Sequence, residues 1–336
     1  MIPDLADVLA RAHVVALPLT TRFRGITVRE AVVIDGPRGW TEFAPFTEYD
    51  DVEACSWLRA AYAFGWEELP PPLRTHVGIN ATVPAVAPTD VARVLAAFGS
   101  CRTAKVKVAG PGETLADDIA RVARVREVMG PEGRIRLDAN GAWNVDEAER
   151  AIHALAPFDL EYVEQPCAST EELAQIRERV AYMDIPIAAD ESVRKAQDPL
   201  EVARMGAADL LVVKAAPLGG VRDALNIVRA SGLPAVVSSA LDTSIGIGMG
   251  LALAAALPEL EFDCGLGTAA LLDTDVVDEP LIPVDGLLAV QRPVASYRLL
   301  EQCAADPERN VWWRERLTRV HHELEVRELE AAEREA

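Results

Sequence analysis

Short β-branched runs alternate with amphipathic stretches through the middle of the chain. The runs expected to be strands cover residues 76–83, 104–109, 134–140, 160–166, 186–192, 209–215 and 234–240, with a weaker one at 262–267. A helical pattern follows each of the first seven, as at 113–129 and 145–155. Strands that alternate with helices pair in parallel through crossover connections.

The spacing of polar residues favours a closed barrel. Intervals of 26, 26, 24 and 24 residues separate Asp138, Glu164, Asp190, Lys214 and Ser238, which is one strand–helix unit per step. About eight such strands close into a barrel of roughly 250 residues. An open doubly wound sheet is the competing architecture. It is disfavoured because no GxGxxG follows the first strand and polar residues recur at successive strand ends.

The two ends of the chain have a different pattern. Strand-like runs at 12–19, 27–36 and 39–46 precede a helical stretch at 49–68 and three prolines at 70–72. Near the other end, Trp312, Trp313 and Leu317 lie in a charged helical stretch. The predicted fold is an α/β (β/α)7β TIM-like barrel over 76–300, with an α+β capping domain over 1–75. A helical segment over 301–336 packs back to complete the cap, and its acidic end frays.

Composition and net charge limit the classes of molecule that the protein is expected to bind. Half of the 336 residues are hydrophobic and 26% are charged, which is enough to bury a large core. The net charge of −20 makes nucleic acid and anionic membrane surfaces poor partners. A small anionic substrate beside a divalent metal remains compatible with it. The sequence leaves the oligomeric state open.

The lack of a targeting signal and the pattern of cysteines favour a cytoplasmic location. The first residues lack the basic and apolar regions of a signal peptide. The longest apolar stretch, 245–257, is too short to cross a bilayer. The five scattered cysteines form no CxxC pair, so we expect reduced thiols.

Charged side chains occur on single faces of the predicted strands. Because side chains alternate along a strand, Lys105 and Lys107 share one face and Val106 takes the other. Asp138 and Asn140 share a face in the same way. If the valine packs on the helices, both lysines point into the barrel.

Three carboxylates are expected to meet at the barrel mouth. Asp138, Glu164 and Asp190 end consecutive strands, and oxygen-only ligands favour Mg²⁺ or Mn²⁺. Lys107 and Lys214 stand on either side in strand order. A metal and a lysine base are suited to removing a proton next to a carboxylate. Each acid alone is more often a helix cap or a surface ion partner, but the joint pattern favours a site.

The motifs around these residues resemble those of the enolase superfamily, in its muconate-lactonising branch. They are KVK at 105–107, LDANGAW at 137–143, EQP at 164–166, ADES at 189–192 and VVKAAPLGG at 212–220. The resemblance implies that the three acids bind Mg²⁺, with Mn²⁺ as a substitute. It also implies that Lys107 is the acid/base, that Lys214 faces it and that Lys105 lowers the pKa of Lys107. Asn140 and Glu191, within the same motifs, are supporting residues.

The closer resemblance is to the o-succinylbenzoate synthases of menaquinone biosynthesis. It rests on segments 18–34, 39–46, 238–247 and 265–272. It implies a syn elimination of water from 2-succinyl-6-hydroxy-2,4-cyclohexadiene-1-carboxylate, giving 2-succinylbenzoate. Lys107 would remove the proton beside the carboxylate and then protonate the departing hydroxyl. Lys214 would stabilise the charge over the ring.

Several residues are candidates for contacts with the succinyl tail. Small residues permit close backbone approach, although tight packing explains glycines equally well. Two arginines in the capping loop at 21–25 would steer a doubly anionic substrate, or are solvated surface charges. The full candidate set is Arg22, Arg24, Ser239, Leu241, Asp242, Gly265 and Gly267.

Rival functions share this predicted site. An N-acylamino acid racemase or a dipeptide epimerase would also use two opposed lysines, and a muconate cycloisomerase is a third candidate. Dipeptide epimerases of this branch resemble one another in an acidic DxD motif on the last strand. Residues 265–268 contain no acid here, although Asp263 lies just upstream. A noncatalytic barrel that binds a partner is disfavoured, since it needs no cluster of buried charges.

Overall fold

The first part of the chain forms an antiparallel sheet covered by helices. The computed structural model describes residues 2–195 and 198–335. Strands β1 (Ala12–Phe23), β2 (Ile26–Gly36) and β3 (Gly39–Phe43) pair in that order. Alternate residues of β2 pack into two different apolar clusters, Val32 and Ile34 into one and Ala31 and Val33 into the other. The sheet is therefore buried on both faces.

Helix α2 (Asp51–Trp66) packs on this sheet, after a short helix α1 (Leu5–Ala10) at the start of the chain. The Asp50 carboxylate accepts the Glu53 N–H at 2.7 Å, which caps the first turn. Cys55 and Leu58 are buried on the predicted inner face, but Val52 is exposed. The helical period placed Val52 inward; it is in the first turn, where the helix has not yet reached the core.

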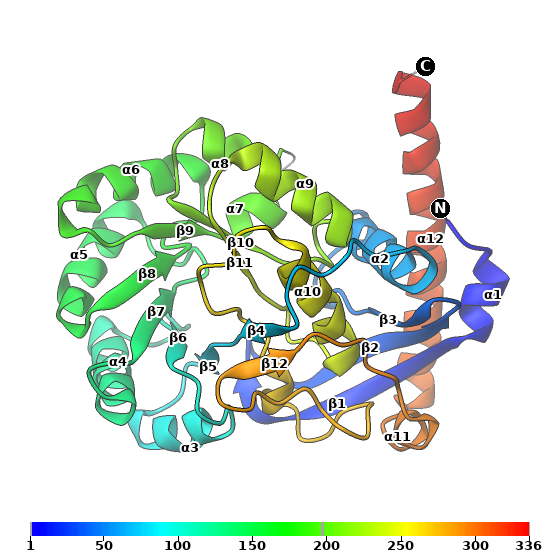
Figure 1. Cartoon of the computed structure of the whole chain (residues 1–336), viewed down its shortest axis with the longest axis horizontal. Helices are drawn as coiled ribbons and strands as arrows, with labels where there is room; N and C mark the ends of the chain where they lie inside the picture. The colour runs from blue at the N-terminus through cyan, green and yellow to red at the C-terminus, as the bar shows by residue number, and fades with distance from the viewer. Residues whose placement is uncertain (1, 196–197, 336) are drawn as a thin grey trace.

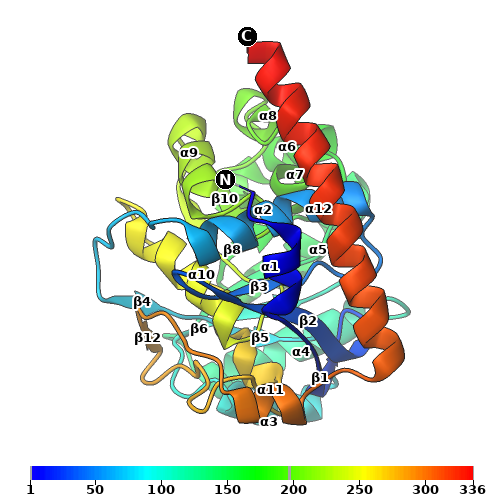
Figure 2. The ribbon, with the colours of Figure 1, turned by 90° about the vertical axis from the view of Figure 1, so that its right-hand side faces the viewer.

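The C-terminal helix α12 (Pro307–Glu335) packs along α2 and β1 (Figures 1 and 2). Trp313 and Leu317 are fully buried, and the Trp313 indole donates to the Glu30 carboxylate at 2.9 Å. The buried Arg316 donates to the Tyr49 carbonyl at 2.6 Å. The chain end therefore joins the N-terminal elements, while the last turns project beyond the body (Figure 2).

Seven parallel strands form the second sheet, in sequence order from one edge to the other. They are β5 (Ala81–Val83), β6 (Thr103–Lys107), β7 (Arg134–Asp138), β8 (Leu160–Glu164), β9 (Ile187–Ala189), β10 (Leu210–Val213) and β11 (Ala235–Val237). Parallel bridges join Cys264 to Ile79 and Gly265 to Ser238, so residues 264–265 close the ring. The predicted α/β barrel is confirmed.

Helices follow the barrel strands and cover their outer side (Figure 1). They are α3 (Val91–Ala96), α4 (Leu115–Met129), α5 (Val145–Leu155), α6 (Thr170–Val180), α8 (Glu201–Arg204), α9 (Val221–Ser231) and α10 (Ser244–Ala256). The short α7 (Glu191–Arg194) lies instead at the carboxyl ends of the strands. Capping boxes start α4, α5 and α6. The closing segment is followed directly by a 3₁₀ turn, η4 (Thr268–Leu271), and not by an eighth barrel helix, in keeping with (β/α)7β.

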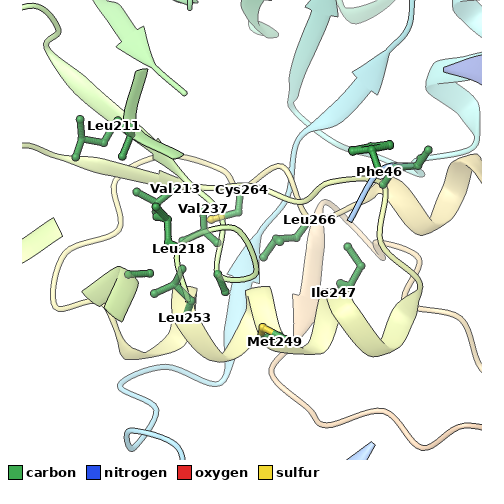
Figure 3. Packing of buried hydrophobic residues seen from close by; sticks show 14 of the residues in the cluster. Phe46, Leu211, Val213, Leu218, Val237, Ile247, Met249, Leu253, Cys264 and Leu266 are labelled. Atoms are coloured by element: carbon green, nitrogen blue, oxygen red, sulfur yellow. The ribbon is translucent and has the colours of Figure 1, made fainter. Parts of the chain in front are cut away.

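The longest apolar run of the sequence forms α10, which is almost wholly buried. Ile247, Met249 and Leu253 of α10 pack near Val237 and Leu266 of the barrel (Figure 3). A helix that is apolar all round belongs in a core. Within the described residues no helix is both long and apolar enough to cross a membrane.

The predicted strand at 76–83 is two strands in the structure. β4 (His76–Gly78) pairs with β12 (Leu287–Ala289), which the sequence did not predict, and only β5 joins the barrel. The amides of Ile79 and Asn80 donate instead to the carbonyls of Gly286 and Cys264, at 2.8 and 3.0 Å. Helix α11 (Tyr297–Gln302) lies beside β1. The division at residues 75 and 300 and the frayed end stay predictions.

Candidate active site

The predicted acids and lysines meet at the C-terminal ends of the barrel strands. Asp138 ends β7 and lies in register with Lys107 of β6 on one side and Glu164 of β8 on the other. Asp190 comes directly after β9, and Lys214 directly after β10. Parallel strands bring their carboxyl ends to one edge, so tandem units gather these distant residues.

Each carboxylate contacts a lysine ammonium group. Lys107 Nζ lies 2.5 Å from Asp138 Oδ2, and Lys105 Nζ lies 3.0 Å from Glu164 Oε1 and 3.1 Å from Asp138 Oδ2. Lys214 donates to Asp190 Oδ2. The three carboxylates are at most 2% exposed, so water contributes little to their solvation.

Burial and opposite charge compete over the carboxyl pKa values. Burial acts to raise the pKa of Asp138, but Lys107 and Lys105 outweigh it and hold the pKa below its usual value. Lys214 and Arg194 likewise outweigh burial at Asp190 and lower its pKa to about 2. At Glu164, burial and the neighbouring Asp138 charge raise the pKa to about 8.

The two lysines of β6 are shifted in opposite directions. Burial, assisted by the charge of Lys105, lowers the pKa of Lys107 against the attraction of Asp138. Burial also opposes the charged form of Lys105, but Glu164 and Asp138 raise its pKa well above the ordinary value. Lys107 is therefore the more readily deprotonated of the pair.

A second layer of polar residues orients the acids. Arg194 donates to Asp190 Oδ1 at 3.1 Å and to Glu191 Oε1 at 2.6 Å. Asn140 accepts from Lys107 at 2.7 Å and donates to Glu191 at 3.3 Å. The supporting residues predicted from the motifs thus lie within the charge network.

Two members of this layer were not assigned to the site from the sequence, although Gln165 lies within the EQP motif. The Gln165 side chain accepts the amides of Asp190 and Ser192 at 2.9 and 3.2 Å, which fixes the turn after β9. Arg194 stands four residues after Asp190, one helical turn away, and that spacing was the available signal.

The donor set fits a hard divalent cation. Three carboxylates supply oxygen ligands only, the kind that Mg²⁺ prefers. Among the described residues, no three carboxylate, His or Cys groups stand in a ready-made ligand arrangement; each of the three acids is instead paired with a lysine ammonium group. Burial and the charge of Asp138 raise the pKa of Glu164, and a cation bound beside it would favour its charged form.

A pocket above these charges lies between the cap and the barrel. Phe23, Arg24, Phe46, Tyr49 and Trp57 line it from the N-terminal elements. From the barrel, the predicted residues in its wall are Lys105, Lys107, Asp138, Asn140, Glu191, Lys214, Ser239, Leu241 and Gly265.

Three predicted substrate contacts lie outside this wall. Arg22 lines an outer cavity next to it, and its Nε donates to the Gly25 carbonyl at 3.1 Å. Asp242 lies behind the wall, in a small adjoining cavity. A Cβ at Gly267 would lie 3.0 Å from Ile79 and 3.1 Å from Phe98, so close packing accounts for this glycine.

Comparison with known proteins agrees with the geometry. The enolase C-terminal domain-like family matches residues 88–294, and the enolase N-terminal domain-like family matches residues 14–64. The o-succinylbenzoate synthase of Mycolicibacterium smegmatis is 55% identical over 321 residues, 95% of this chain and 98% of that protein. The chain belongs to the o-succinylbenzoate synthase family.

A second relative supports the same assignment, and a solved structure supports the fold. The o-succinylbenzoate synthase of Thermobifida fusca is 54% identical over 87% of this chain and 91% of its own length. The muconate lactonizing enzyme of Pseudomonas fluorescens aligns with a TM-score of 0.74 at 21% identity, covering 88% of this chain and 98% of that one. The latter likeness shows the fold.

The resemblance inferred from the motifs is therefore confirmed, and the chain is an enzyme, a lyase. Enolase-superfamily sites combine a lysine or histidine base with one or two divalent ions, generally Mg²⁺. An o-succinylbenzoate synthase acts on a small molecule, which the pocket between cap and barrel is placed to receive.

Proposed function

We propose that this enzyme dehydrates 2-succinyl-6-hydroxy-2,4-cyclohexadiene-1-carboxylate to 2-succinylbenzoate in menaquinone biosynthesis. The main support for this proposal is that Lys107 and Lys214 lie on opposite sides of three buried carboxylates. Their strands, β6 and β10, are four positions apart in the ring. Both lysines line the same pocket, so both reach one bound molecule. We place the reaction in the cytoplasm, with a small anionic substrate.

Asp138, Glu164 and Asp190 would hold Mg²⁺, with Mn²⁺ as a substitute. When bound, the ion stabilises the negative charge that builds up on the substrate carboxylate as the neighbouring carbon loses its proton. The three acids would keep the positive charge of the ion at the ends of the strands. Lys105, bonded to Glu164 and Asp138, keeps two of the ligands oriented.

Lys107 is the proposed base. Its lowered pKa arises from burial and from Lys105, and it stands at the pocket wall beside Asp138. It removes the proton next to the carboxylate and returns a proton to the departing hydroxyl on the same face, which accounts for a syn elimination. Lys214, from the opposite side, stabilises the charge spread over the ring.

The remaining wall residues would contact the succinyl arm. Arg24 reaches the pocket from the capping loop, where its guanidinium lies 4.4 Å from the Phe46 ring centroid. Ser239 and Gly265 meet in the wall, the Ser239 hydroxyl donating to the Gly265 carbonyl at 2.7 Å. Leu241 adds an apolar surface to it.

The structure speaks against a dipeptide epimerase. Asp263, the nearest acid on the last strand segment, accepts from Thr103 and Arg134 at 2.6 Å. Those two residues begin β6 and β7, so Asp263 lies at the opposite end of the barrel from the pocket. It is not placed to grip a substrate amino group.

Racemisation of an N-succinylamino acid is the second candidate, because opposed lysines can exchange a proton on either face. The test is an ultraviolet assay for 2-succinylbenzoate, run beside polarimetry of an N-succinylamino acid, each with and without Mg²⁺. Metal-dependent dehydration supports the main proposal. Racemisation with no dehydration would replace it with the second candidate.

A further inference from the structure

Two buried ionisable side chains from the cap hold one wall of the substrate pocket. We propose that Arg29 of β2 and Glu42 of β3 are positioning residues that fix residues 241–243 in the conformation needed to bind the succinyl arm. We call this pair the cap clamp. The inference rests on the substrate pocket assigned under the proposed function.

Arg29 joins the barrel to the cap side of the pocket. Its side chain is buried, and its Nε donates to the Leu241 carbonyl at 3.0 Å. A second nitrogen donates to the Ala44 carbonyl, and the guanidinium lies 4.5 Å from the Phe46 ring centroid. Leu241 and Phe46 both line the pocket, so one side chain sets the distance between two of its walls.

Glu42 holds the other end of the same segment. Its Oε2 accepts the Thr243 N–H at 3.1 Å and also the Thr243 hydroxyl. Thr243 caps α10, since its Oγ1 accepts the Ile245 N–H at 3.1 Å. A Cβ at Gly246 would lie 2.6 Å from Glu42 Oε1, so this glycine leaves room for the carboxylate.

The segment between these contacts has an unusual backbone. Leu241 has φ of +62°, in the left-handed region that residues other than glycine rarely adopt. Such a conformation persists where the surroundings determine it, and it clusters at ligand sites. The hydrogen bond from Arg29 to the Leu241 carbonyl is one contact from the surroundings that holds Leu241 in this conformation.

Stability alone does not account for the cap clamp. Glu42 and Asp242 are the acids that favour the charged form of Arg29, and all three are buried. Replacing buried charges by apolar residues is often neutral or stabilising, so their presence fits a role in fixing one conformation. Because both members come from the cap, they couple the cap position to the shape of the barrel loop.

The test compares purified Arg29→Met and Arg29→Lys with the wild-type enzyme. We expect Arg29→Met to raise KM about tenfold while kcat stays within about twofold. The substitution removes the hydrogen bond from the charged guanidinium to the Leu241 carbonyl, which shapes the binding wall. Hydrogen exchange should accelerate in the peptide covering 238–247 and not elsewhere in the barrel. Arg29→Lys, which keeps the charge and one donor nitrogen, should show a smaller KM rise.

Arg126→Met is the matched control. Arg126 also holds backbone carbonyls, those of Phe158 and Gly130 at 2.7 and 2.9 Å, and it lines none of the pocket between cap and barrel. Its KM should equal that of the wild type.

Wild-type KM and wild-type exchange of 238–247 in folded Arg29→Met overturn the cap clamp. If that variant does not fold, the same two readouts in Arg29→Lys decide. An absence of dehydration in the wild-type enzyme would refute the proposed function, whereas the exchange result tests the cap clamp without substrate.

Discussion

At the residue scale, the site depends on how close like and unlike charges stand. Lys105 and Lys107 sit two positions apart on β6 and contact the same Asp138 oxygen. The alternation of a strand allows this arrangement, because residues i and i+2 share a face. The lysine pair therefore contains one strongly retained proton and one that leaves more readily.

Changing Lys107 to Ala should lower kcat for dehydration by about 10²–10⁴, the usual contribution of a general acid/base. Circular dichroism and Mg²⁺ titration calorimetry should still report a folded, metal-binding protein. The ultraviolet assay measures the loss. Full turnover in the folded variant would contradict the proposed role of Lys107.

Changing Asp190 to Asn should raise the Mg²⁺ concentration for half-maximal activity by about tenfold or more, equal to about 1.4 kcal/mol of binding. The amide lacks the charge that the cation needs and that Lys214 contacts. Activity measured over a Mg²⁺ series after chelation checks this result. An Asp209→Asn variant is the control, because Asp209 pairs with Arg177 outside the site. An unchanged Mg²⁺ requirement in the Asp190→Asn variant would remove Asp190 from the proposed ligand set.

At the element scale, the contact between α2 and α12 joins the two ends of the chain. The Tyr62 hydroxyl and His321 Nδ1 lie 2.7 Å apart in a buried setting. Burial lowers the pKa of His321, and His322 assists, although Glu325 acts in the opposite direction. The neutral imidazole is therefore the form that fits between the helices.

This shift makes stability depend on pH in a predictable direction. The unfolded chain binds the His321 proton at higher pH than the folded chain, so the stabilisation is complete above about pH 6.5 and falls as the pH drops through the folded pKa. Thermal unfolding at pH 7.5 and 5.5 should show a smaller difference for His321→Phe than for the wild type. His322→Phe, at an exposed neighbour, is the control. An equal pH difference in all three proteins would contradict the burial argument.

At the scale of the whole molecule, the pocket exists only where cap and barrel meet. Tyr49 of the cap receives hydrogen bonds from Arg24 of the capping loop and from Arg194 of the barrel, both at 3.3 Å. The C-terminal helix supports the cap through Arg316 and Trp313, neither of which lines the pocket. We therefore expect activity to depend on residues near the end of the chain.

Truncation tests this dependence. A chain ending at residue 328 loses the end of α12, in which residues 329–333 are exposed, and its free energy of unfolding should change by less than about 1 kcal/mol. A chain ending at residue 310 loses Trp313 and Leu317 and should neither fold stably nor turn over substrate. Calorimetric unfolding and the ultraviolet assay measure both effects. A stable, active protein ending at residue 310 would show that α12 is dispensable.

Local periodicity was enough to predict much of this protein. Alternation along β6 placed Lys105 and Lys107 together, and the unit length of 24 to 26 residues brought Asp138, Glu164 and Asp190 to one barrel end. These features follow from repeats of 2.0 and 3.6 residues and from parallel strand order, which the sequence carries directly.

Contacts between distant segments were decided only by the tertiary structure. The pairing of β4 with β12, the direction of Asp263 and the reach of Arg29 to the Leu241 carbonyl join segments separated by many residues. No local period encodes such contacts, because they depend on how two finished layers pack. The sequence by itself thus determined which charged residues gather at the barrel mouth, whereas packing of the cap determined the shape of the pocket above it.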